Sequence, residues 1–127
     1  MIGKAVVALI KADATLNTLI AGRIAPWPLP QKMTFPAVAF VVEDKPSNGC
    51  DNGTTIIQNE VTVHIMAETL LEAETVGQEI KRVLHRFNGL AGGVQVQSIV
   101  YANGGDDFDN ELRKHYIDQM YRATVLT

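Results

Sequence analysis

The stretch that decides the fold is GRIAPWPLPQKMTFPAVAF, residues 22–40. Three closely spaced prolines, at positions 26, 28 and 30, each fix φ and remove a backbone donor. We therefore expect this proline arm neither to continue a helix nor to lie inside a sheet. Pro36 then opens the apolar run AVAFVV at 37–42, whose length and branching are typical of a buried strand. The arm divides the chain into a helical start and a β-rich remainder.

Two short helices are predicted before the arm. Asp13 is expected to cap the second of them, and Gly22 to close it at the C′ position. The apolar residues of the first helix recur at helical spacing and form one stripe. They are Ile2, Val6, Leu9 and Ile10.

A period of two begins after the first strand, at Asn59. Val61, Val63 and Ile65 fall on one face, which predicts a half-buried antiparallel strand at 56–67, paired with a strand at 37–44. The segment between them, 45–54, is dense in turn formers and is predicted to be a loop. We predict that this loop is mobile in the free subunit and becomes ordered against a neighbour. Its candidate interface residues are Asn48, Gly49, Asp51 and Asn52.

The longest helix is predicted at 69–88. Its acidic residues crowd the first half and its basic residues the second, an order that suits the helix dipole. Gly89 and the Gly92-Gly93 pair are expected to end it. The apolar residues keep a spacing of three and four and predict one buried face. They are Ala73, Val76, Ile80, Val83, Leu84 and Phe87.

Two further strands complete the expected fold, at 94–102 and 113–126, with a polar acidic loop from Ala102 to Asn110 between them. The order of elements predicts a single α+β domain over residues 1–127. We expect a four-stranded, mostly antiparallel sheet, with one long helix packed on a face and an N-terminal helical segment.

Composition narrows the function classes. Hydrophobic residues make up 46% of the 127 residues and charged residues 20%, as in ordinary soluble globular proteins. The formal net charge of -3 argues against a duplex-binding protein. Cys50 is the one cysteine, so neither an intrachain disulfide nor a cysteine-based zinc site is possible. No apolar run approaches the length of a membrane span, so we expect a protein made in a reducing cytoplasm.

No catalytic motif is found, and we expect neither an enzyme nor a cofactor or metal site. The sequence lacks a phosphate loop, a metalloprotease helix and a nucleophile elbow. The three histidines are scattered, and each is interpreted as a satisfied surface or interface residue. They are His64, His85 and His115.

Two features remain as candidates for an interface. Trp27, flanked by prolines, is interpreted either as a core plug for the arm or as an anchor in a partner. The other is an acidic concentration for which a solvated turn is favoured over a site for a hard cation. Its carboxylates are Asp106, Asp107, Asp109 and Glu111.

The chain resembles the tail-completion, or tail-terminator, proteins of long-tailed bacteriophages and prophages. The resemblance covers about residues 2–126 and depends on layout more than on any single motif. Its carrying segments are LNTLIAGRI, FPAVAF, VTVHIMAE, LLEAETVGQEIKRVLHRF, GGDDFDNE and HYIDQMYRATV.

This resemblance implies a structural role in the virion tail, with assembly in the host bacterial cytoplasm. Similar proteins form a ring, usually of six subunits, which ends polymerisation of the tail tube and joins the tail to the head. The implied partners are further copies of the chain, the major tail tube protein and a head-completion or connector protein. DNA would pass through the ring without specific binding, and no membrane is involved.

Two alternatives from other classes stay open: another head–tail connector component (an adaptor, stopper or minor capsid protein), and a small α+β enzyme. Within the ring interpretation, we predict that the acidic turn at 106–111 faces the channel, where carboxylates would repel the phosphates of passing DNA. A solvated hairpin on the outer rim is the competing interpretation.

Overall fold

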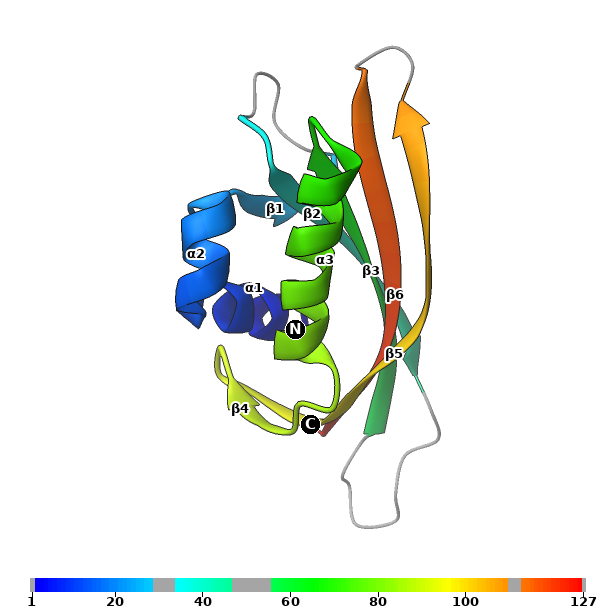
Figure 1. Ribbon diagram of the computed structural model, residues 1–127. Coiled ribbons are helices and arrows are strands. Elements are labelled where there is room, and N and C mark those ends of the chain that lie inside the picture. The colour runs from blue at the N-terminus through cyan, green and yellow to red at the C-terminus, as the bar shows by residue number, and fades with distance from the viewer. Residues whose placement is uncertain (1, 29–33, 47–55, 110–112, 127) are drawn as a thin grey trace.

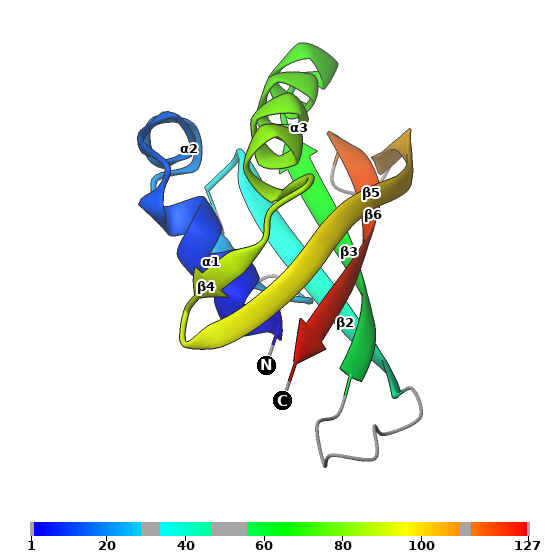
Figure 2. The same cartoon turned by 90° about the horizontal axis from the view of Figure 1, so that it is seen from below.

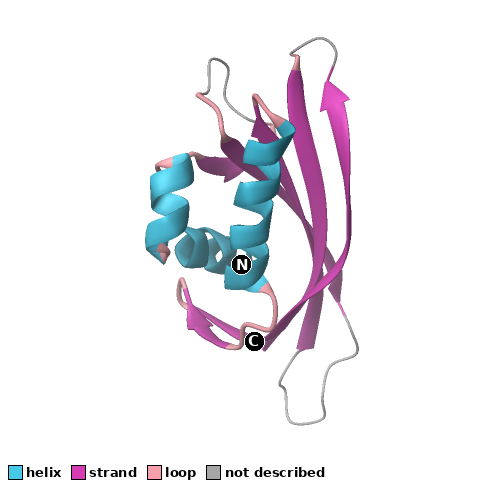
Figure 3. Cartoon of the chain, viewed as in Figure 1, coloured by secondary structure: helices cyan, strands magenta, loops and turns pink. Residues whose placement is uncertain are grey.

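Three helices lie on one side of a curled six-stranded sheet in the computed structural model, which describes residues 2–28, 34–46, 56–109 and 113–126 (Figures 1 and 3). The helices are α1 (Ile2–Ala12), α2 (Ala14–Ile20) and α3 (Leu70–Leu84). The strands are β1 (Ile24–Pro26), β2 (Ala37–Pro46), β3 (Ile56–Ala67), β4 (Gly89–Ala91), β5 (Val94–Asp109) and β6 (Lys114–Leu126). The α+β class is confirmed, whereas the four-stranded sheet with one long helix is too simple.

The strand order is β1-β2-β3-β6-β5-β4, with every neighbouring pair antiparallel except β1 and β2. The predicted pairing of the first two long strands is confirmed, since Val38 lies opposite Ile65 and Val42 opposite Val61. The predicted inner face of β3 is also confirmed, because Val61, Val63 and Ile65 are all buried in the core.

The proline arm does contribute a strand, contrary to expectation. β1 pairs in parallel with β2. Two hydrogen bonds flank this pairing: Val38 N–H donates to the Arg23 carbonyl, and Trp27 N–H donates to the Phe40 carbonyl. Pro26 is tolerated because β1 is an edge strand, where no neighbour needs the missing donor.

The helix α3 is shorter than predicted and ends at Leu84. It begins as expected at Thr69, whose hydroxyl accepts a hydrogen bond from the Glu72 N–H at 3.2 Å. After the helix, the backbone turns to β5: Arg86 N–H donates to the Ile99 carbonyl, and Ile99 N–H donates to the Phe87 carbonyl. Bonding to the sheet thus replaces the last expected turn of the helix.

A small hairpin follows, where the sequence had indicated only a helix end. Gly92 and Gly93 have φ of 56° and 78° and separate Ala91 from Val94, which are paired residues of β4 and β5. Two successive residues with positive φ are typical of the two-residue turn whose twist suits a hairpin.

The sheet curls around α1, which contacts both β2 and β4 (Figure 2). Two glycines permit these close approaches. A Cβ at Gly3 would lie 3.1 Å from the ring of Phe40, and one at Gly92 would lie 2.6 Å from the Lys4 carbonyl oxygen. The core is therefore enclosed by the sheet on one side and by α1 and α3 on the other.

One polar connection crosses this core, between α3 and β6. Gln119 donates from Nε2 to the Gly77 carbonyl at 3.0 Å and accepts from the Tyr121 hydroxyl at 2.7 Å. A Cβ at Gly77 would lie 3.1 Å from that amide nitrogen, so the glycine lets the helix approach the strand. Burial raises the pKa of Tyr121, with a smaller contribution from Tyr101.

Candidate assembly surface

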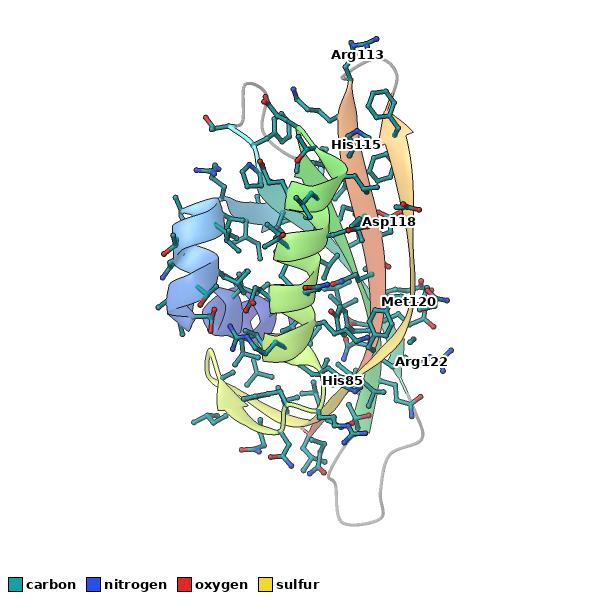
Figure 4. All side chains as sticks on the ribbon, in the orientation of Figure 1. His85, Arg113, His115, Asp118, Met120 and Arg122 are labelled. Carbon is teal, nitrogen blue, oxygen red and sulfur yellow. The ribbon has the colours of Figure 1, made fainter. Side chains whose placement is uncertain are left out.

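The helices leave one face of the sheet uncovered, and we define it as the outer face (Figures 1 and 3). Figure 4 shows Asp118, Met120 and Arg122 along β6, on this side of the sheet. They alternate with Gln119, Tyr121 and Ala123, which are buried against the core. The outer face also carries apolar side chains: Val41 is 41% exposed and Val100, opposite Arg122, is 46% exposed. It combines apolar, aromatic and charged groups, as protein interfaces do.

A row of aromatic and polar side chains crosses this face. The rings of Trp27 and His64 are 4.9 Å apart between centroids and are tilted by 48°. His64 Nδ1 in turn lies 2.5 Å from Oδ1 of Asp118, the residue opposite it on β6. Ala39 lies opposite His64 on β2 and is fully buried, although it belongs to the outer face. Trp27 of the proline arm therefore covers the sheet at this point.

Trp27 is not a core plug, because 51% of its surface is exposed. The chain leaves β1 toward the outer face, and the indole rests on His64 instead of entering the space beneath the helices. This position favours the anchor interpretation. The expectation that His64 is a satisfied surface or interface histidine agrees with its contacts to Trp27 and Asp118.

The acidic segment is mostly strand, whereas the sequence had indicated a loop and a turn. β5 continues to Asp109 because its pairing with β6 resumes after irregularities between Val96 and Ser98 and between Tyr101 and Asn103. Asp106 lies opposite Ile117 and is exposed. Asp107 and Asp109 belong to the same strand, opposite Tyr116 and Lys114.

The structure does not bring Trp27 and Asp106 onto one surface. Gly105 lies opposite Asp118, so the row that begins at Trp27 reaches β5 at Gly105. Asp106 lies opposite Ile117, which packs against the core, and so belongs to the other face of the sheet. Five predicted residues lie outside the described part of the chain. They are Asn48, Gly49, Asp51, Asn52 and Glu111.

Sequence reasoning missed Asp118 as a member of this surface. Its outward position follows from the alternation of side chains along β6, a strand that the sequence predicted, but its partner depends on the register between β3 and β6. A period of two assigns a residue to a face without telling which residue lies opposite.

The other two histidines also have partners. His85 Nδ1 accepts a hydrogen bond from the Tyr101 N–H at 3.0 Å, just after α3 ends. The ring of His115 packs edge-on against Phe108, with 4.7 Å between centroids. Among the described residues, no group of three or more histidine, cysteine or acidic side chains is placed to hold a metal ion.

Comparison with known proteins gives the family. Residues 4–126 match the family described as Tail completion protein gp17. The chain belongs to this family. The predicted resemblance to phage tail-completion proteins is thus confirmed over nearly the whole length, and the family is one of virion structural proteins.

The fold also recurs in a solved particle. A chain described as "Virion of native gene transfer agent (GTA) particle" is similar with a TM-score of 0.79 and 14% identity, over 97% of this chain and 92% of that one. At this identity the similarity shows the fold alone. No curated protein matches the sequence. None of the described helices is long and apolar enough to cross a membrane.

Proposed function

We propose that this member of the tail completion family forms a closed ring of six copies on the head-proximal end of the tail tube. The ring ends polymerisation of the tube and joins the tail to the head. The observation that carries the proposal is the family match over residues 4–126. Its partners are further copies of the chain, the major tail tube protein and a head-completion or connector protein.

The outer face supports an assembly role. It is uncovered by helices and presents Trp27, Val41 and Val100, each more than 40% exposed. Exposed large apolar groups with charged neighbours are typical of surfaces that bind other proteins. We propose that Trp27 anchors such a contact, since large aromatic residues contribute strongly at interfaces.

Gene deletion tests the proposal. The gene is removed from a phage or prophage that carries it, and the particles are imaged by electron microscopy. Overlong tails, or full heads beside unattached tails, are expected because nothing would end the tube or join it to the head. Complementation with the wild-type gene is the control. Normal virions from the deletion strain would contradict the assembly role, and unattached tails of normal length would assign joining without termination.

A further inference from the structure

We propose that the free edge of β5 over residues 102–107 binds an extended segment of another protein of the particle, and that this segment carries lysine or arginine. We call residues 102–107 the open edge. The identity of the partner as a particle protein rests on the proposed function, whereas the binding chemistry rests on the edge itself.

The open edge begins where other segments stop forming hydrogen bonds with the side of β5 opposite β6. β4 pairs only with residues 94–96 of β5. The segment after α3 then covers the next residues, because Ile99 bonds to Arg86 and Phe87, and Tyr101 N–H donates to His85. From Ala102 to Asp107, no described residue pairs with the side of β5 opposite β6.

From Asn103 onward, the backbone of the open edge is arranged as a regular strand. Its register with β6 runs without interruption from Asn103 opposite Met120 to Asp107 opposite Tyr116. Tyr101 turns its N–H away from β6, toward His85. The irregularity at 101–103 shifts the alternation by one residue. Beyond it, the backbone N–H and C=O groups of Gly104 and Asp106 therefore also point away from β6. Their donors and acceptors form a template on which another strand can add.

The opposite edge of the sheet is closed to such addition. The backbone of Ala25 faces β2, between the bonds that Arg23 and Trp27 make with that strand. Of the other two residues of β1, Ile24 uses its N–H on the Gly22 carbonyl at 2.8 Å, and Pro26 has none. A strand approaching β1 would find carbonyl groups but no donor, so the two edges are not equivalent.

Charge selects the partner. The stretch 102–109 contains three aspartates and no basic residue, and Asp106 is exposed on it. Two copies of the open edge paired with each other would set like charges across the ladder, which is unfavourable. A segment with basic residues at alternate positions would instead place opposite charges across it. The occupant is therefore a basic extended segment of a different protein.

Hydrogen exchange on the full chain tests the proposal. The probes are two capped octapeptides, one alternating lysine with valine and one alternating glutamate with valine. At about nine times its Kd, the lysine peptide should slow exchange of the Gly104 and Asp106 amides by about tenfold. The glutamate peptide should leave these rates unchanged. Because neither peptide requires the particle, failure here would leave the head–tail role standing.

Two charge reversals provide the matched variants. Asp106→Lys should weaken binding of the lysine peptide by about fivefold or more, since it replaces an attraction across the ladder with a repulsion. Glu74→Lys makes the same change of charge at an exposed position of α3 and should leave the affinity unchanged. Protection by neither peptide would mean that the aspartates keep the edge unpaired, and it would overturn the proposal. Equal protection by both peptides would overturn the selection by charge.

Discussion

Asp13 connects two helices through one carboxylate. It caps α2 by accepting a hydrogen bond from the Leu16 N–H at 3.0 Å, and Arg82 of α3 donates to both of its oxygens at 2.8 Å. The bond from Arg82 is the main cause that holds the pKa of Asp13 below its ordinary value of 3.8, and the bond from Leu16 adds to it. The same contact raises the pKa of Arg82.

Substitution of Asp13 separates the cap from the ion pair. Asp13→Asn keeps an oxygen that can accept from the Leu16 N–H but loses the charge that pairs with Arg82, whereas Asp13→Ala loses both interactions. At pH 7, Tm should therefore be highest for the wild type, lower for Asp13→Asn and lowest for Asp13→Ala. A carboxyl group with a lowered native pKa stabilises above its unfolded pKa and loses that contribution as pH falls through the native value. The gap between wild type and Asp13→Asn should therefore close as pH falls below about 3.8. Thermal melts between pH 2 and pH 7 check this, and a gap independent of pH would contradict the ion pair.

Among the elements, α3 matches its predicted pattern most closely. Ala73, Val76, Ile80 and Leu84 are all fully buried, and the helix packs against β3, β5 and β6. The two outer members of the predicted stripe, Val83 and Phe87, are only partly buried against the core. Phe87 lies beyond the end of the helix, where the chain turns to β5.

Ile80→Asp should prevent stable folding, because it buries a carboxylate among apolar side chains with no cation beside it. We expect a loss above about 4 kcal/mol, which exceeds the usual effect of a point substitution. Gln78→Asp introduces the same side chain at an exposed position of α3 and should cost about 1 kcal/mol or less. Urea unfolding followed by circular dichroism measures both variants. Similar midpoints for the two would show that the buried face of α3 is wrongly assigned.

At the scale of the whole molecule, closure of the core depends on contact between α1 and the β4–β5 hairpin. Gly92 lies against the Lys4 and Ala5 backbone, whereas no atom lies within 4 Å of the Cβ position of Gly93. Both glycines have positive φ, so alanine is strained at either position.

The difference between Gly92→Ala and Gly93→Ala therefore isolates the packing of α1 on the hairpin. Backbone strain is common to both variants, and only Gly92→Ala forces the helix away from the turn. We expect Gly92→Ala to be the less stable of the two by about 1–3 kcal/mol, the usual cost of overpacking. Denaturant unfolding at equilibrium measures the difference, and equal stabilities would show that α1 does not rest on this turn.

The sequence by itself determined the class of the fold and the faces of its main elements. Periods of two and of 3.6 assigned Val63 to the inner side of a strand and Ile80 to the inner side of a helix, because burial of apolar groups requires those spacings. Its layout also identified the family, which the match over residues 4–126 confirmed. Both results depend on local order along the chain.

Only the tertiary structure decided where strands end, which edge is closed and what lies beside Trp27. Asp106, Asp107 and Asp109 have poor strand propensity, yet they extend β5 because β6 supplies a partner. Residues 24–26 of the arm became an edge strand for a similar reason, because β2 supplied hydrogen-bond partners and the pairing needs no N–H from Pro26. These outcomes depend on register and on contacts between segments far apart in sequence, such as Trp27, His64 and Asp118, which no local pattern contains.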